Sequence, residues 1–371
     1  MRPDICQRLC LAMKEQGLDA VITVSPENFG YVNGFIVPSQ PLMRWRHAIT
    51  VLRQDGKNAV IVIDMEESTV RNRDKETEIR VWGEFEDDPM VILCHLLEDM
   101  GLAGANIGIE FDYLAVKDWQ TLSRCLPEAN FSGAEDLLTR LRQVKTIEEI
   151  ELLRRLSYIA DKAISDALAS VSEGSTEMDI AAALTRGVYS MGVQGFKLMI
   201  VATGERSVYP NVGPSERVLK DQDVCRVEIF AVIDGYQAGV CRTAVVNQAP
   251  PEAERIWKHL VECKYLVMEM IKPGVSSRSV YQAFTDHMSK LDLAPIKFIG
   301  HSIGLHLHEE PYLGNFSDVP LEAGMVLGIE PLVYNTGFGF GMQNKDMFLV
   351  TETGCELLSN YSDTDQLLVV K

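Results

Sequence analysis

The sequence of 371 residues lacks features that mark several classes of protein. Its eight cysteines include no Cys-x-x-Cys pair, which argues against a disulfide framework and predicts reduced, mostly buried thiols. No apolar run approaches the roughly 20 residues that a membrane-spanning helix needs. The first ten residues mix Arg2, Asp4 and Arg8 with apolar residues, so we find no signal-peptide core. These absences predict a cytoplasmic protein without a membrane segment.

Basic residues are also few, 35 Lys and Arg against 53 Asp and Glu, and the net charge is −18. A partner with a phosphate backbone would need a basic face, so we expect no nucleic-acid partner. No internal repeat or low-complexity segment is evident. The length is sufficient for two domains, each with its own core.

Strand and helix patterns alternate in the first part of the chain, which predicts an α/β layer structure. Apolar runs at residues 20–24, 48–52, 58–63, 77–83 and 107–110 predict strands, and residues 5–16, 89–100 and 113–125 have helical spacing. A long amphipathic helix then follows a capping box formed by Thr146 and Glu149. We therefore expect one domain over residues 1–136 and a second over residues 137–371.

The second region contains two chemically informative stretches. Residues 224–246 predict a hairpin that turns at Asp234-Gly235 and places Arg226 and Glu228 on one face. Residues 300–311 read Gly-His-Ser-Ile-Gly-Leu-His-Leu-His-Glu-Glu-Pro, with three of the seven histidines of the chain. The alternation of His306 and His308 with leucines predicts a strand, and a bend at the glycines would bring His301 into the same cavity. A surface strand end with hydrated histidines is the simpler alternative.

These stretches and three others resemble the pita-bread superfamily of methionine aminopeptidases, prolidases and creatinase. The others are Pro210-Asn-Val-Gly-Pro-Ser-Glu-Arg217, Glu322-Ala-Gly-Met325 and Gly328-Ile-Glu-Pro331, and all occur in the family order. The resemblance implies an α+β fold in which a pita-bread C-terminal domain follows a smaller creatinase-type α/β domain. It also implies a homodimer whose N-terminal domain contributes to the partner's site.

Peptidases of this superfamily hold two metal ions with five ligands, and the resemblance places those ligands on Glu228, Gly239, His301, Glu330 and Lys345. Glycine has no ligand atom, and a lysine ammonium has no lone pair. A metal ion at this position would also lie near the positive charge of Lys345. At an effective dielectric of about 20, two unit charges of the same sign about 4 Å apart repel by about 4 kcal/mol. We therefore expect no metal and no cofactor, with Glu228 and Lys345 contacting substrate instead.

Creatinase shares the loss of the bridging carboxylates, so the sequence leads us to a hydrolase of the creatinase type. We expect a metal-independent cleavage of a non-peptide C–N bond in a small zwitterion. His301, His308 and Glu330 are the predicted catalytic residues. The residues predicted to bind substrate are Tyr209, Asn211, Arg44 and Arg46, and Arg44 is the first candidate for the substrate carboxylate. Asn211 occupies the position at which creatinase has its proton-shuttling histidine.

Three other hypotheses remain open at this point. One is a metal-dependent Xaa-Pro peptidase, which Gly239 and Lys345 disfavour. Another is a lyase, since the same fold hosts an enzyme that acts on dimethylsulfoniopropionate. The last is a catalytically inactive relative that binds a ligand, which the changes at Asn211, Gly239 and Lys345 favour. Arg44 and Arg46 could also form only a solvated basic patch, and Lys345 only a structural ion pair.

Overall fold

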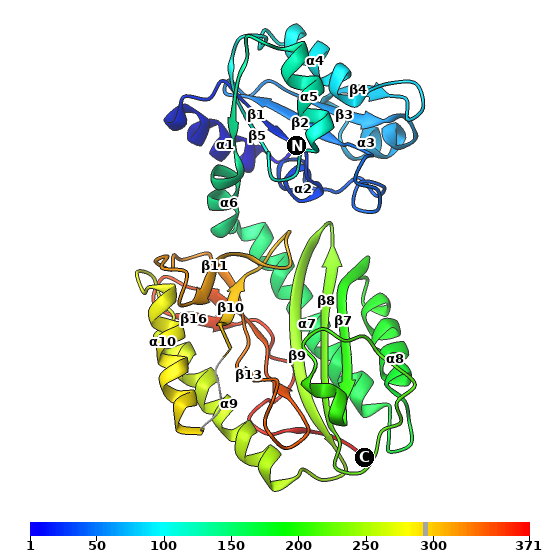
Figure 1. Cartoon of the computed structure of the whole chain (residues 1–371), viewed down its shortest axis with the longest axis vertical. Coiled ribbons are helices and arrows are strands. Elements are labelled where there is room, and N and C mark those ends of the chain that lie inside the picture. Colours follow the sequence, from blue (N-terminus) through cyan, green and yellow to red (C-terminus); the bar gives the residue numbers. More distant parts are fainter. Residues whose placement is uncertain (292–295) are drawn as a thin grey trace. The chain divides into compact units, whose positions relative to one another are not determined.

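A computed structural model describes residues 1–291 and 296–371 and divides the chain into two compact units, Met1–Arg142 and Gln143–Lys371 (Figure 1). The expected boundary between residues 136 and 137 falls within helix α6 (Glu135–Gln143). Within the described residues, no helix is both long and apolar enough to cross a membrane.

The N-terminal unit is built on a six-stranded sheet with the order β4-β3-β2-β1-β5-β6. Its strands are β1 (Ala20–Thr23), β2 (Ile49–Arg53), β3 (Asn58–Ile63), β4 (Glu78–Trp82), β5 (Asn106–Ile109) and β6 (Asn130–Gly133). Strand β2 pairs antiparallel with β1 and β3, and the other pairs are parallel. The helices are α1 (Pro3–Gln16), α2 (Pro26–Asn33), α3 (Glu67–Arg73), α4 (Pro89–Asp99), α5 (Val116–Cys125) and α6.

Alternation along β3 explains why this sheet has helices on both faces. Ile61 and Ile63 belong to a core with α4 and α5, whereas Val60 and Val62 belong to a second core with Phe29 of α2. Successive strand side chains point to opposite faces, so an all-apolar strand must be covered on both. The α/β layer structure expected from the sequence is confirmed.

The C-terminal unit contains two larger sheets, in the orders β17-β9-β8-β7 and β11-β10-β12-β15-β16, and a small pair, β13-β14. The first sheet comprises β7 (Gly195–Thr203), β8 (Val224–Ile233), β9 (Tyr236–Val246) and β17 (Leu368–Val370). The second comprises β10 (Phe298–Ser302), β11 (Glu309–Gly314), β12 (Val326–Ile329), β15 (Asp346–Val350) and β16 (Cys355–Leu357). The small pair joins β13 (Leu332–Val333) to β14 (Met342–Gln343).

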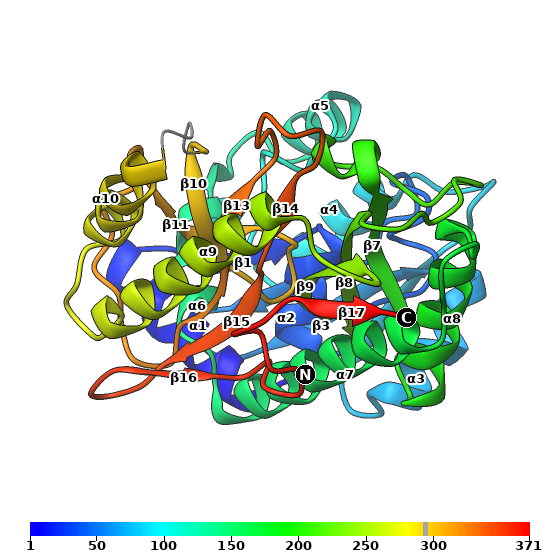
Figure 2. The same cartoon turned by 90° about the horizontal axis from the view of Figure 1, so that it is seen from below.

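Two helix pairs pack against these sheets (Figures 1 and 2). Helices α7 (Ile147–Ala169) and α8 (Glu177–Ser190) accompany the first sheet, and both begin with a capping box. Helices α9 (Pro251–Met270) and α10 (Ser277–Met288) share a core with β10, β12 and β15. The expected pita-bread architecture is confirmed, and the two sheets meet at a bridge between Cys241 and Lys345.

Candidate functional site

The β8–β9 hairpin supplies one wall of the candidate site. Its turn at Asp234 and Gly235 has positive φ angles of 48° and 85°, which suits a two-residue hairpin turn. The resulting register places Glu228 opposite Cys241 and Phe230 opposite Gly239. Because alternate residues share a face, Arg226, Glu228 and Phe230 all project from the same side of β8.

The ammonium of Lys345 is the centre of a buried cluster. Its Nζ lies 3.3 Å from Glu228 Oε1, 3.2 Å from Glu330 Oε2 and 3.2 Å from Nε2 of His301. An ammonium carries three N–H groups, so each of these acceptors can take one. The Phe230 ring lies behind it, with its centroid 4.6 Å from Nζ. All five side chains are buried.

Hydrogen bonding determines which nitrogen of His301 carries the proton. Nδ1 lies 2.9 Å from the carbonyl oxygen of Ser302, which can only accept. Nδ1 is therefore the donor, and the lone pair of Nε2 faces Lys345. Burial, followed by the charge of Lys345, lowers the pKa of His301 well below its usual value, so the ring is neutral.

His308 stacks on His301, with ring centroids 3.8 Å apart and an interplanar angle of 21°. The structure therefore brings the two imidazoles side by side. Burial and then the Lys345 ammonium lower the pKa of His308 to about 4. Unlike His301, His308 has an exposed edge and can reach a ligand from solvent.

The expected strand through His306 and His308 is wrong, because both residues lie in the loop between β10 and β11. The buried ammonium of Lys145 lies 3.0 Å from both Ser302 Oγ and Glu309 Oε2. These contacts draw the two ends of the segment together, so it turns back instead of extending. The backbone N–H of His306 also donates to Glu309.

Arg226 and Gln343 form an outer layer that the sequence did not assign to the site. Gln343 Nε2 donates to Glu330 Oε2 at 2.9 Å, and its Oε1 accepts from Arg226 Nη1 at 2.9 Å. Arg226 and Lys345 thus balance the two carboxylates in formal charge. Burial nevertheless raises the pKa of Glu228, although Lys345 opposes that shift. The shared parity of Arg226 and Glu228 on β8 was the available signal for Arg226.

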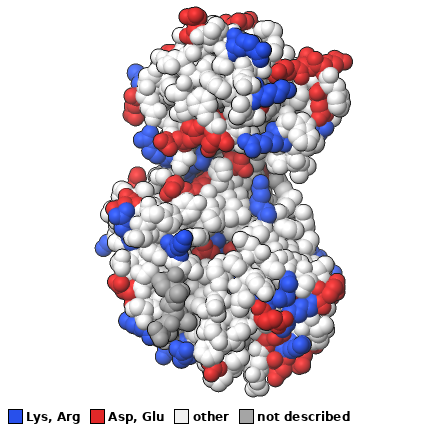
Figure 3. All heavy atoms as spheres, viewed as in Figure 1, with Lys and Arg blue, Asp and Glu red and all other residues white. Residues whose placement is uncertain are grey.

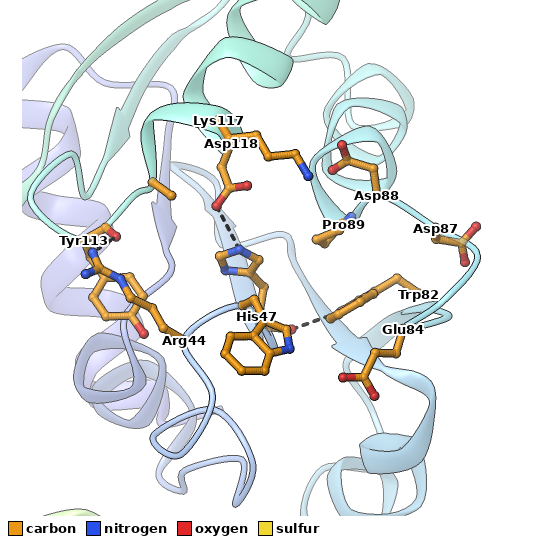
Figure 4. Close-up of a pocket in the computed structure, with 12 residues that line it drawn as sticks. Arg44, His47, Trp82, Glu84, Asp87, Asp88, Pro89, Tyr113, Lys117 and Asp118 are labelled. Carbon is orange, nitrogen blue, oxygen red and sulfur yellow. Dashed lines mark hydrogen bonds and ion pairs between the residues drawn. The ribbon is translucent and has the colours of Figure 1, made fainter.

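The remaining predicted residues lie outside this cluster. Tyr209 and Asn211 are exposed in the segment before β8, where the Tyr209 carbonyl accepts from Arg226. Arg44 and Arg46 belong to the N-terminal unit. Arg46 forms a two-pronged ion pair with Glu84, and Arg44 lies over the Tyr113 ring in a cavity of about 440 Å³ (Figure 4).

A two-metal centre does not fit these side chains. Gly239 has no ligand atom, and a side chain at that position would collide with the Phe230 ring. Lys345 cannot coordinate a cation, and its ammonium already engages Glu228, Glu330 and His301. Three of the five family ligand positions thus keep a donor atom, and all three are turned toward a positive charge.

Comparisons with known proteins identify the family. Residues 151–352 match metallopeptidase family M24, and residues 6–144 match the creatinase/prolidase N-terminal domain. The chain therefore belongs to metallopeptidase family M24, and the predicted superfamily is confirmed.

Similarity to known proteins extends along nearly the whole chain. An Xaa-Pro dipeptidase of Pyrococcus furiosus is 25% identical, over 95% of this chain and 97% of its own. The crystal structure of dipeptidase PepE from Mycobacterium ulcerans has a TM-score of 0.85 and 25% identity, over 99% of this chain and 97% of its own. An X-Pro aminopeptidase from Thermotoga maritima, at 23% identity and a TM-score of 0.86, shares the fold.

These relatives contradict the creatinase-type function expected from the sequence. The coarser expectation of a hydrolase is supported by the family, but the relatives are named for peptide substrates. The metal-independent, creatinase-like assignment is therefore withdrawn. It rested on two ligand positions, whereas the similarity to dipeptidases spans both domains.

Proposed function

We propose that this protein is a hydrolase of short peptides, with Xaa-Pro dipeptides as its substrate class. The observation that carries the proposal is the full-length similarity to proteins named dipeptidases. A dipeptide is a small zwitterion, which also suits a site that contains carboxylates and neutral histidines. No nucleic-acid partner is proposed, and Figure 3 shows acidic and basic side chains interspersed on the visible face, without a continuous basic patch.

His308 is the residue best placed to act on the peptide. Its ring has an exposed edge and is neutral near pH 7, so it can accept a proton from a water molecule that attacks the peptide carbonyl carbon. The imidazolium formed in this way can then donate that proton to the amine that leaves as the C–N bond breaks. Stacking on the buried His301 holds the ring in position. Glu330 and Glu228 are the candidates for the substrate ammonium, because carboxylates form charge-assisted hydrogen bonds with it.

Arg44 is our candidate for the substrate carboxylate, supplied by the partner subunit of a homodimer. A guanidinium matches a carboxylate in shape, and Arg44 is exposed. Arg46 is the weaker candidate because Glu84 already occupies its guanidinium. Tyr209 and Asn211 are proposed as further contacts from the C-terminal unit. Since the ligand set does not fit two metal ions, no step is assigned to a metal.

The Lys345 cluster favours a second candidate function, a peptide-binding protein without turnover. The three N–H groups of the ammonium all have acceptors in the folded chain, so none is left for a substrate. The Phe230 ring fills the space beside Gly239. In this case the same dipeptides would bind and be released unchanged.

One experiment separates the two functions. The purified chain is incubated with a panel of Xaa-Pro dipeptides and with Ala-Ala, after chelation and again with added Mn²⁺, Co²⁺ or Zn²⁺. Released proline reports turnover, and calorimetry reports binding. Turnover that His308→Ala and Glu330→Gln abolish supports the hydrolase. The matched variants His95→Ala and Glu269→Gln change exposed residues of the same types and should retain the activity.

Three other outcomes of this experiment are possible. Binding without product under every condition supports the second function and overturns the first. Neither binding nor product overturns both. Turnover that requires an added ion would overturn our conclusion that the ligand set does not fit a metal centre. The triple variant Phe230→Gly, Gly239→Asp, Lys345→Glu then shows whether restoring that set creates or strengthens metal binding.

A further inference from the structure

Helices α9 and α10 pack against each other and bring together three side chains of types that can bind a metal, away from the Lys345 cluster (Figures 1 and 2). His259 and Glu262 are three residues apart on α9, so they share a face of that helix. His287 lies in the last turn of α10. One ligand atom from each residue lies within 4.8 Å of the other two.

The contacts in this group are those of ion pairs. Glu262 Oε2 lies 3.2 Å from His259 Nδ1 and 3.4 Å from His287 Nε2. Both nitrogens are buried, and neither has a well-aligned hydrogen-bond partner in the described part of the chain.

The spacing is that of ligands around one ion. Four ligands at about 2.0–2.1 Å from a tetrahedral zinc ion lie about 3.3 Å from one another. Two of the three distances in the group, 3.2 and 3.4 Å, are close to this value. Two imidazoles and one carboxylate are a donor set that binds zinc, with a fourth position left for water.

We propose that His259, Glu262 and His287 form a binding site for one divalent transition-metal ion, with zinc as the best-suited ion. The ion would link α9 to α10 and would offset the cost of leaving two buried imidazole nitrogens unpaired. Because none of its ligands belongs to the Lys345 cluster, this site is independent of the proposed peptide chemistry.

The test uses the full-length chain after chelation and dialysis. Zinc is titrated by calorimetry, and Co²⁺ is added separately to follow the visible absorption of four-coordinate cobalt. We expect one ion per chain, a higher unfolding temperature with zinc, and at least tenfold weaker binding in His287→Ala and Glu262→Gln. His95→Ala, at an exposed histidine, and His308→Ala should bind the ion as the wild type does.

Two outcomes would overturn the proposal. One is a wild-type chain that binds neither ion, which would leave the group as an ordinary His–Glu ion pair. The other is binding that survives His287→Ala and Glu262→Gln, or that is lost in His308→Ala instead, which would place the ion elsewhere. Circular dichroism of Glu262→Gln, a replacement of nearly equal size, separates loss of the site from loss of the fold.

Discussion

At the scale of single residues, Lys345 places a positive charge at a position where the resemblance to the family predicts a metal ligand. Its ammonium is surrounded by the hydrogen-bond acceptors of Glu228, Glu330 and His301. Removing it would leave Glu228 and Glu330 buried without their nearest positive charge. Breaking a buried ion pair in this way typically costs about 3–5 kcal/mol. We therefore expect Lys345→Met to lower the free energy of unfolding by about that amount, measured by urea denaturation.

The control for this prediction is Lys162→Met, which removes a lysine from an exposed ion pair with Asp166 on α7. Surface pairs contribute little, so the urea midpoint of this variant should be unchanged. A Lys345→Met variant as stable as the wild type would mean that the cluster does not depend on the ammonium.

The neutrality of His308 gives a pH prediction. Its pKa is lowered from 6.5 to about 4, so the folded state binds this proton less well than the unfolded state does. The contribution of the group to stability is thus complete above about pH 6.5 and is lost as the pH falls toward 4. Dipeptide binding that uses neutral His308 should stay constant from pH 8 down to about pH 5.

An NMR titration of the histidine ring protons measures this pKa directly, with His308→Ala used for assignment. In Lys345→Met the midpoint should rise, because the ammonium is the second cause of the shift after burial. A wild-type midpoint near 6.5 would contradict the lowered pKa of His308.

At the scale of elements, a buried arginine joins the helix and strands that hold the Lys345 backbone. Arg242 of β9 contacts Asp161 of α7 and Asp346 of β15, each at 2.8 Å. It also donates to the Lys345 carbonyl oxygen at 2.9 Å. Arg242 and then Lys264 lower the pKa of Asp346 against the opposing effect of burial.

Arg242→Met should therefore destabilise the protein by about 3–5 kcal/mol, since Asp161 loses its buried cation and Asp346 keeps only Lys264. Thermal and urea unfolding measure the loss. Arg154→Met, which removes a partly exposed ion pair with Glu356, should cost less than about 1 kcal/mol. Equal effects of the two substitutions would contradict the role assigned to Arg242.

At the scale of the whole molecule, we expect a homodimer. In the N-terminal unit, Trp45 and Phe85 are 63% and 93% exposed, although both are large and apolar. They adjoin the ion pair between Arg46 and Glu84. Large exposed apolar groups often mark a protein interface.

Light scattering after size exclusion should give about twice the chain mass of 41.4 kDa. The double variant Trp45→Ser, Phe85→Ser should shift the protein toward the monomer. Tyr189→Ser, at an exposed residue of α8, is the control and should remain dimeric. A monomeric wild type would overturn the expectation and with it the role proposed for Arg44. The predicted cytoplasmic location remains a prediction.

The sequence by itself determined most of the elements and the family. Local signals suffice there, because capping boxes, hairpin turns and apolar periodicity involve residues close together in the chain. Thus the Thr146 cap and the Asp234-Gly235 turn form as predicted. Strand β7 and helix α2 are among the elements that were not predicted from the sequence, as are α3, β6 and the short strands β13, β14, β16 and β17.

The tertiary structure decided how the site is arranged. Lys345 meets Glu228 across more than one hundred residues of chain, and the Phe230 ring occupies the space beside Gly239 only because β8 and β9 pair in that register. Likewise, Lys145 folds the histidine segment into a loop where local alternation predicted a strand. Local pattern sets which residues form strands and helices, whereas long-range packing and buried charge set which of their side chains meet.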